Sequence, residues 1–379
     1  MRDRKMHLLA YVKTGPTAQL AGAWRHPEAD LDDIFEPERY EHMARVLEAA
    51  RFDGCFFADT LGLPDIYKGS FATYLRYGGQ LSYLDPMVVL PVMARATRHL
   101  GLGATLSTTF HHPYHLARIL ASLDHLSHGR ACWNVVTSTT DFEARNFGLA
   151  DLPAKELRYD RADEVVEACC ALWDCWQEDA LVMDKESGLF IDPEKVRYAD
   201  YEGRYVRTRG PLTIPRCPQG RPVLMQAGSS PRGRDFAARW AEAIFCSSGS
   251  KKDALEFYTD IKWRMARFGR LPDDCAICTS TTIVLGETQS IAREKAEYLT
   301  SLECRPQCAG RRHPRPDRAP RPAISPDRLW LARRPARHGE LSAFRGHRRQ
   351  PDRVWRRLCH LARLRQDRGS LLARQRLEW

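Results

Sequence analysis

The 379-residue sequence has no apolar stretch of the length that a membrane span requires, about 20 consecutive apolar residues. Basic residues at the N-terminus precede only a short apolar run, which Lys13 interrupts before any small-residue cleavage pattern, so we expect no export signal. The twelve cysteines follow no regular spacing, which argues against a secreted disulfide framework. We therefore expect reduced thiols, a cytoplasmic location and no membrane partner.

No GxGxxG sequence joins a strand pattern to a helix pattern, so a nicotinamide-binding domain is not expected. Patterns typical of metal sites are also lacking. The histidines within residues 111–115 surround Pro113, which interrupts the helix that zinc-binding histidines usually share. The CxxC pair of Cys275 and Cys278 has no second pair in the chain. We predict that the protein has no metal site.

Lysine is absent from residues 303–379, which contain 21 arginines and 7 acidic residues. Residues 1–302 carry 37 basic and 41 acidic side chains, so the net charge of +10 at pH 7 comes from the C-terminal segment. An arginine-rich segment is one means of binding nucleic acid. This segment lacks the interleaved aromatic residues that stack on bases, so nucleic-acid binding is the less favoured alternative.

Residues 6–302 alternate between short apolar runs and amphipathic helical patterns, which indicates a parallel α/β fold. Polar residues follow several of the runs. This favours a (β/α)8 TIM barrel, whose active site lies at the carboxyl ends of its strands. The expected strands are residues 6–12, 54–58, 100–107, 130–137, 222–226, 243–247 and 276–285.

Residues 177–220 break this alternation. They are rich in turns, and Tyr, Val and Arg alternate within them. Inserted segments of this kind often cover a substrate, so we expect a hairpin excursion over the barrel mouth.

The sequence VLMQAGSSPRGR, residues 223–234, predicts a loop that binds phosphate. An apolar run enters a turn that contains Gly228, Ser229 and Ser230, and a helical pattern follows. A glycine lets the backbone approach a ligand, the serines offer hydroxyls, and the N-terminus of a helix attracts an anion. An ordinary strand–turn–helix corner is the alternative interpretation of the same residues.

Seven stretches of the chain together resemble the bacterial-luciferase-like flavin-dependent monooxygenases, in the branch of dibenzothiophene-sulfone monooxygenase and nitrilotriacetate monooxygenase component A. The resemblance covers about 300 residues and stops at about residue 303. The stretches are GAWRHPEAD (22–30), LGLGATLSTTFHHPYHLAR (100–118), ASLDHLSHGRACWNVVTS (121–138), EARNFG (143–148), RYDRADE (158–164), RGPLTIPRCPQGRPVLMQAGSSPRGRDFAARWAEAIF (209–245) and EYLTSL (297–302).

The resemblance implies a luciferase-like TIM barrel that binds reduced FMN, supplied by a separate NAD(P)H:flavin oxidoreductase. It implies the oxygenase component of a two-component, FMNH2-dependent monooxygenase. Such an enzyme oxidises a small organosulfur, amine or xenobiotic substrate through a flavin C4a-hydroperoxide, and a homo-oligomer is expected. A deazaflavin-dependent oxidoreductase of the same superfamily is the alternative.

The resemblance also implies where the flavin binds. Asp59 matches a flavin-contacting aspartate, and Thr105 matches a residue under the isoalloxazine ring. Without the resemblance, Asp59 would be interpreted as the cap of a helix. Tyr159 and Ser230 match groups around the ribityl phosphate, and Ser229 adjoins them.

Lys155 takes the place of a histidine that is common in the family four residues before that tyrosine. A lysine also pairs with phosphate, as a point charge. His26 and Asn134 are the candidates for a catalytic role, although Asn134 is equally suited to satisfying backbone groups at the barrel rim. The aromatic residues expected to line the site are Trp24, Phe56, Phe57, Phe110, Tyr114 and Trp133.

Residues 1–302 are thus expected to form an incomplete barrel without its eighth strand, and residues 303–379 a poorly ordered Arg/Pro-rich tail. A frameshift near codon 303 of a GC-rich gene would produce such a composition. A natural basic tail and an unrelated fused segment are the alternatives. Loss of the eighth strand opens the edges of the first and seventh strands. Because folded proteins are stable by only about 5–15 kcal/mol, we expect aggregation or inactivity.

Translation of the gene in its other two forward frames past codon 302 tests the frameshift hypothesis. We expect one frame to encode an apolar strand and amphipathic helices that complete the barrel. The hypothesis is wrong if neither frame does so, or if the chain as it stands is a stable and active enzyme.

Overall fold

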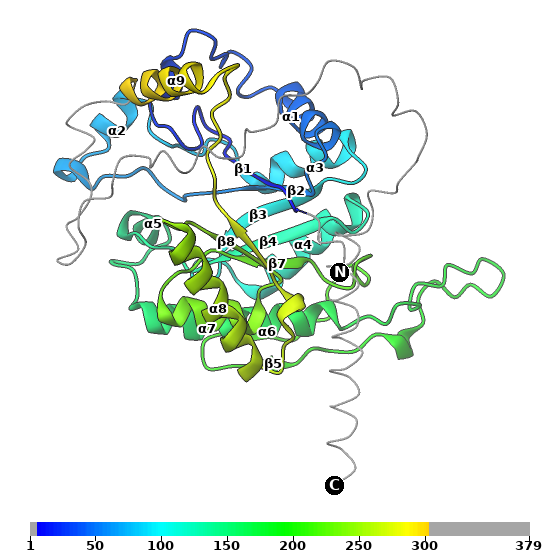
Figure 1. The fold of residues 1–379 in the computed structure, drawn as a ribbon. Coiled ribbons are helices and arrows are strands. Elements are labelled where there is room, and N and C mark those ends of the chain that lie inside the picture. Colours follow the sequence, from blue (N-terminus) through cyan, green and yellow to red (C-terminus); the bar gives the residue numbers. More distant parts are fainter. Residues whose placement is uncertain (1–5, 303–379) are drawn as a thin grey trace.

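The computed structural model describes residues 6–302, which form a parallel sheet nearly closed into a barrel, with helices around it (Figure 1). This confirms the expected TIM-barrel class. Neighbouring strands are parallel and follow the order β1-β2-β3-β4-β7-β8-β9. They are β1 (Leu9–Val12), β2 (Gly54–Phe57), β3 (Gly101–Ser107), β4 (Ala131–Val136), β7 (Val223–Gln226), β8 (Ala243–Cys246) and β9 (Ala276–Thr279).

The main helices begin where the sequence offers a cap. Proline occupies the first turn of α1, α3, α4 and α7, and side chains of Asp85, His112, Ser230, Ser250 and Thr288 accept backbone N–H groups at helix starts. The long helices are α1 (Pro37–Ala49), α3 (Pro86–Ala96), α4 (Pro113–Leu126), α6 (Lys155–Trp173), α7 (Pro231–Trp240), α8 (Lys251–Arg267) and α9 (Gln289–Ser301). The short ones are α2 (Ala72–Arg76), α5 (Asp141–Asn146), η1 (Ala23–Arg25), η2 (Tyr67–Gly69), η3 (Pro193–Lys195) and η4 (Pro272–Asp274).

Alternate residues of each strand face the barrel interior or the helices. Inside the barrel, the rings of Tyr11, Phe56 and Phe245 meet in pairs at 5.4–5.7 Å between centroids. The contact joins β1 to β8, so the sheet curls far enough for strands near its two ends to touch. Phe57 and Trp133 belong instead to the core between sheet and helices. Their expected place in the lining of the site is therefore wrong.

The strand expected at 276–285 is shorter in the structure and ends at Thr279. Its partner β8 ends at Cys246, opposite Thr279, and the last backbone hydrogen bond to β8 runs from Ser280 N to Cys246 O at 2.7 Å. Ile283 and Leu285 are consequently 72% and 76% exposed. Within residues 6–302 no strand pairs with β9 on its other side, which agrees with the expected absence of an eighth strand.

The excursion at 177–220 is present, but its expected position over the mouth is wrong. It leaves the end of α6 and returns at the start of β7, and both points lie at the amino-terminal end of the barrel. Its antiparallel pair β5 (Tyr201–Glu202) and β6 (Arg207–Thr208) lies along α6. A hairpin around residues 181–191 projects from the body (Figure 1), with Val182 N donating to Phe190 O at 3.0 Å.

Two buried arginines close the amino-terminal end of the barrel. Arg130 donates to the carbonyls of Ala94, Thr97, Leu100 and Ser127, at the ends of α3 and α4. Arg270 donates to carbonyls at the end of α7 and to Asp274 O. A cation favours the negative end of a helix dipole, where several carbonyls lack the full set of donors that the helix interior supplies.

Asp124 in α4 ties the end of the excursion to this region. Its carboxylate accepts hydrogen bonds from Ala131 N at 3.2 Å and from both the backbone and side chain of Gln219. The side chain is fully buried. Burial raises the pKa of Asp124 to about 6, although the three donors act in the opposite direction.

This pKa predicts how stability changes with pH. The folded pKa lies above the unfolded one, so the buried carboxylate costs stability above about pH 6 and the cost falls as the pH falls. Between pH 7 and pH 5 the free energy of unfolding should rise by about 1 kcal/mol more in the unmodified protein than in Asp124→Asn, which does not titrate. Urea unfolding at both pH values measures this difference, and parallel pH profiles would contradict it.

Candidate functional site

Thr105 and Asn134 lie side by side at the carboxyl ends of β3 and β4, facing the barrel interior. Thr105 Oγ1 donates to Phe57 O at 2.7 Å and accepts from Asn134 Nδ2 at 2.9 Å. Asn134 Oδ1 is buried and has no hydrogen-bond partner among the described residues. A buried acceptor without a partner is costly, so this oxygen is suited to an N–H group of a bound ligand.

Asp59 follows β2 at the same end of the barrel. Residues 60–66 are not helical, so the interpretation of Asp59 as a helix cap is wrong. Its carboxylate accepts from Thr60 N at 2.8 Å and interacts with the Ser82 hydroxyl. Burial raises the pKa of Asp59, while these hydrogen bonds and the charge of Lys13 act in the opposite direction.

Tyr159 and Ser230 come together at the corner between α6 and α7. Ser230 Oγ caps α7 by accepting from Gly233 N at 3.1 Å, and the Tyr159 hydroxyl interacts with Ser230, Gln226 and Thr137. A Cβ on Gly228 or Gly233 would lie 2.5 or 2.6 Å from the Tyr159 hydroxyl, so only glycine leaves it room at either position. Gln226 Oε1 is buried nearby without a partner in the described part of the chain.

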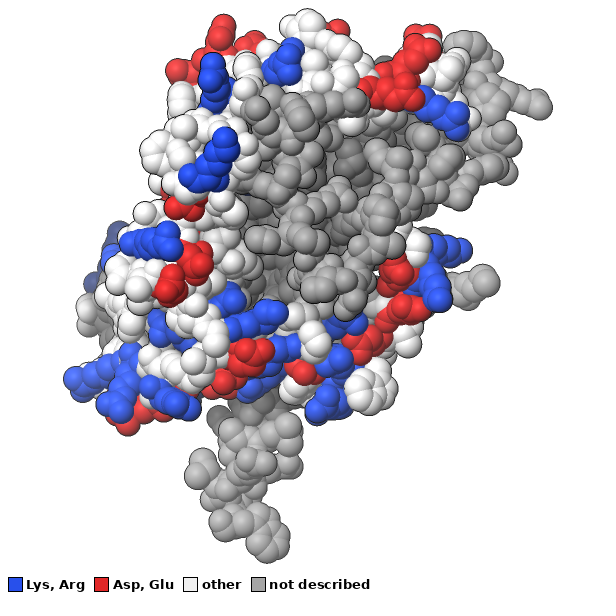
Figure 2. All heavy atoms as spheres, turned by 90° about the vertical axis from the view of Figure 1, so that its left-hand side faces the viewer, with Lys and Arg blue, Asp and Glu red and all other residues white. Residues whose placement is uncertain are grey.

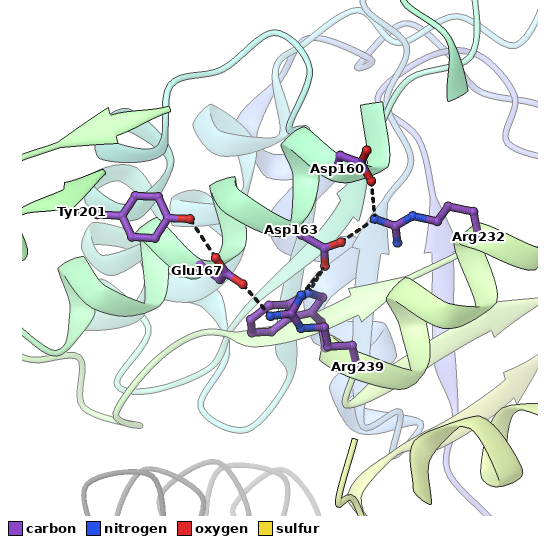
Figure 3. Close-up of polar contacts among 7 residues, drawn as sticks. Asp160, Asp163, Glu167, Tyr201, Arg232 and Arg239 are labelled. Atoms are coloured by element: carbon purple, nitrogen blue, oxygen red, sulfur yellow. Dashed lines mark hydrogen bonds and ion pairs between the residues drawn. The ribbon is translucent and has the colours of Figure 1, made fainter. Parts of the chain in front are cut away.

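A network of charged side chains fixes this corner, as Figure 3 shows. Asp163 of α6 pairs with Arg232 and Arg239 of α7, and also accepts from Trp240 Nε1 at 2.6 Å. On either side of it, Asp160 pairs with Arg232 at 3.1 Å and Glu167 pairs with Arg239. The two helices that carry Tyr159 and Ser230 are thereby held in one relative position.

The other predicted site residues make fewer contacts with these two groups. Ser229 and Lys155 are exposed beside this corner, with Lys155 one helical turn before Tyr159 on α6. His26 lies on the loop after β1. Its Nδ1 accepts from Glu28 N at 3.1 Å, and its ring packs against Tyr298 of α9 at 5.6 Å. The structure therefore groups Thr105 with Asn134 and Tyr159 with Ser230, and gives His26 contacts in its own loop and with α9.

Two basic residues of this region were not predicted from the sequence. Arg158 donates to the carbonyls of Thr137 and Ser138 and so ties the loop after β4 to α6. Lys13 follows β1 and donates to Gln80 O at 3.0 Å. The alternation along β1 would have indicated Lys13, because it lies two residues after the interior-facing Tyr11.

A pocket of about 520 Å³ opens beside Asp59. Its walls combine apolar groups with polar groups on the loops after β2 and β4. The lining residues are Thr60, Gly62, Leu63, Pro64, Asp65, Phe71, Gln80, Leu81, Ser82, Phe142, Arg145 and Asn146.

Residues 6–302 offer neither a candidate metal cluster nor a candidate membrane span. No group of three or more His, Cys, Asp or Glu side chains there could hold a metal ion. No helix of that segment is long and apolar enough to cross a membrane. Seven of its nine cysteines are buried, and burial raises the pKa of Cys55 to about 12, so this thiol stays protonated.

The parallel barrel defines a TIM-barrel protein. Its polar groups without hydrogen-bond partners lie at the carboxyl ends of the strands, which indicates a ligand site at the mouth. The chain belongs to the luciferase-like monooxygenase family, whose sequence pattern matches residues 17–366. The match extends into residues 303–366, where the frameshift hypothesis applies and which lie outside the described residues.

Curated relatives match over about the length of the predicted barrel segment. The chain is 48% identical over 302 residues to dibenzothiophene-sulfone monooxygenase of Rhodococcus erythropolis (strain XP), covering 79% of this chain and 66% of that protein. It is 37% identical over 287 residues to nitrilotriacetate monooxygenase component A of Aminobacter aminovorans, covering 74% and 63%. The chain thus spans about two thirds of the length of these relatives.

Solved structures show the same fold. The crystal structure of a long-chain alkane monooxygenase superposes with a TM-score of 0.76 at 36% identity, covering 79% of this chain and 69% of that one. A riboflavin lyase with modified FMN and riboflavin gives a TM-score of 0.73 at 33% identity, covering 79% and 67%.

The corner between α6 and α7 yields a prediction about ligand phosphate. If FMN binds with its phosphate at this corner, as the resemblance implies, Ser230→Ala should weaken its binding by about 1–2 kcal/mol, because it removes a hydroxyl expected to contact the phosphate. Fluorescence titration measures the dissociation constant, on this chain or, if it aggregates, on the version with the restored reading frame.

Ser250→Ala is the matched control. Ser250 caps α8 by accepting from Asp253 N at 3.1 Å, the same geometry as Ser230 in α7. Loss of this cap should lower stability to a similar extent and leave FMN binding unchanged. Equal FMN affinity of Ser230→Ala and the unmodified protein would remove Ser230 from the phosphate site.

Proposed function

We propose that the chain is the oxygenase component of a two-component monooxygenase that uses reduced FMN. The family membership and the names of the relatives support the general class. The observation that carries the cofactor assignment is the pair of buried acceptors without partners, Asn134 Oδ1 and Gln226 Oε1, at the barrel mouth. A flavin ring and its ribityl chain offer N–H and O–H donors of the kind that these oxygens require.

The residues of the mouth fit the parts of FMN. The N-terminus of α7 and the Ser230 and Tyr159 hydroxyls would hold the phosphate. Thr105 and Asn134 would contact the ring, with Asp59 nearby. Ser229 and Lys155 would add a hydroxyl and a positive charge at the exposed side of the phosphate.

When bound, reduced FMN supplies the electrons that activate oxygen for transfer to a substrate. The chain's own residues would bind and orient the cofactor and the substrate. They would also exclude water from the site. Phe56 and the rings around it form an apolar floor below Thr105 and Asn134, so water is displaced from the base of the site. Asp59, whose pKa burial raises, is the group at the mouth best suited to hold a proton.

The pocket beside Asp59 would receive the substrate. Phe71, Phe142 and Leu81 supply apolar walls, and Arg145 and Asn146 supply hydrogen-bond donors. A small organosulfur or amine compound with polar oxygens matches this lining. Relatives named for a sulfone, for dimethyl sulfide and for nitrilotriacetate agree with that class. His26 and Asn134 remain the candidates for a catalytic role.

The remaining parts of the proposal are a partner NAD(P)H:flavin oxidoreductase, a homo-oligomer and a cytoplasmic location. The designation of one relative as component A of nitrilotriacetate monooxygenase supports a two-component system. A deazaflavin-dependent oxidoreductase is the second candidate. The solved deazaflavin enzymes share 17% and 13% identity with this chain, and such a likeness supports the fold alone.

A nucleic-acid-binding role gains no support from the face of the molecule drawn in Figure 2. On the face in Figure 2, the Lys and Arg side chains of the described residues are interleaved with Asp and Glu rather than gathered in a basic stripe.

Electron supply distinguishes these functions. With NADH and oxidised FMN the isolated chain should not oxidise NADH, because residues 6–302 contain no Rossmann-type loop for a nicotinamide. Oxygen uptake and substrate oxidation should begin when a flavin reductase or chemically reduced FMN is added to the chain or, if the chain aggregates, to the version with the restored reading frame.

An oxygen electrode and NADH absorbance measure both steps. Rapid NADH oxidation by the chain alone would contradict the two-component proposal. Turnover with a reduced deazaflavin but not with reduced FMN would favour the second candidate.

A further inference from the structure

Lys13 lies at the barrel mouth in the same layer as the proposed ring-binding residues. Val12, Phe57 and Ala104 are paired across β1, β2 and β3, and Thr105 is paired with Asn134 across β3 and β4. One residue further along, Lys13 therefore stands in the row that contains Thr105 and Asn134. Residues in one row of a sheet face the same side, so the Lys13 side chain is directed into the barrel.

The Lys13 ammonium group is half-buried, and its hydrogen bond to the described residues uses only part of its N–H donors. It donates to Gln80 O at 3.0 Å, whereas an ammonium group has three N–H donors. Burial lowers the pKa of Lys13, and the negative charge of Asp59 raises it. A lysine in this position is not explained by packing, because the layer beneath it consists of the rings of Tyr11, Phe56 and Phe245.

The two redox states of FMN differ in charge at the ring and not at the phosphate. Oxidised isoalloxazine is neutral, whereas the reduced ring readily loses a proton near neutral pH and becomes an anion. The corner of Tyr159 and Ser230 would therefore attract both states equally. A positive charge in the ring layer favours the reduced state alone, and in a poorly solvated site it acts over several ångströms without direct contact.

We propose that Lys13 is the residue that makes the site select reduced over oxidised FMN, by placing a positive charge in the layer of Thr105 and Asn134. The inference rests on the proposed function. Neighbouring strands lie about 4.8 Å apart, so Lys13 is three strands, or roughly 14 Å along the sheet, from Asn134. Its Nζ is held at Gln80 O, on the loop that lines the pocket beside Asp59.

The test compares the dissociation constants of oxidised and reduced FMN under anaerobic conditions. Lys13→Met removes the charge but keeps an unbranched stem, and should lower the preference for the reduced form by about tenfold. Lys13→Arg keeps the charge and should retain the preference. Ser230→Ala should weaken both forms equally, because it acts on the phosphate.

Lys262→Met is the matched control. Lys262 is also partly buried and donates to the backbone carbonyls of Pro272 and Cys275, just before β9 and therefore at the end of the barrel away from the mouth. Its loss removes one lysine charge from the chain and should leave the preference unchanged. The midpoint potential of the bound flavin is a second readout, and should fall in Lys13→Met only.

Each outcome decides between the two claims. If neither the unmodified chain nor the version with the restored reading frame binds either form of FMN, the proposed function fails and the role of Lys13 fails with it. If Lys13→Met binds both forms with an unchanged ratio, or weakens both equally, Lys13 only supports the loop around Gln80. The proposed function then stands and the inference is overturned.

Discussion

The carboxylate of Asp163 is the interaction on which the geometry of the mouth depends. It is mostly buried between α6 and α7 and receives Arg232, Arg239 and the Trp240 indole. A buried carboxylate is tolerable only when it is fully paired, and its removal would leave Arg232 paired with Asp160 alone and Arg239 paired with Glu167 alone. The spacing of the Tyr159 and Ser230 hydroxyls follows from this link, because each lies on one of the two helices.

Buried polar groups are paired at one end of the barrel and lack partners at the other. At the amino-terminal end, Arg130 donates to four backbone carbonyls that surround it. At the mouth, Asn134 Oδ1 and Gln226 Oε1 are buried without partners in the described chain. The first arrangement stabilises the fold by itself. The second costs free energy until a ligand supplies donors, so stability and binding are assigned to different ends of the same strands.

Much of the fold could be predicted because apolar periodicity and cap residues are local features of the sequence. The strand at Val223–Gln226, the turn at Gly228 and the cap Ser230 are read directly from residues 223–234. Pairing partners are not local. The end of β9 at Thr279 depends on where β8 ends, and the place of the excursion depends on contacts of Gln219 with Asp124. Phe56 and Phe57 are equally apolar, and only strand register separates the barrel interior from the helix layer.

The same limit applies to the site. The resemblance gave Tyr159 and Ser230, which the structure brings together, and Asp59, which it places beside a pocket. The resemblance gave no reason to single out Lys13 or Arg158. The proposed role of Lys13 depends on the residues across the barrel, and the role of Arg158 depends on the carbonyls beside α6.

The hairpin around residues 181–191 has a practical consequence. Its turn is closed by its own hydrogen bonds, including Asp184 N to Leu189 O at 2.9 Å and Glu186 N to Asp184 Oδ1 at 2.9 Å. It starts and ends at the amino-terminal end of the barrel and projects from the body (Figure 1). A peptide tag or a fluorophore placed at Lys185 would therefore stand clear of the flavin and substrate groups, and of the helices that orient them.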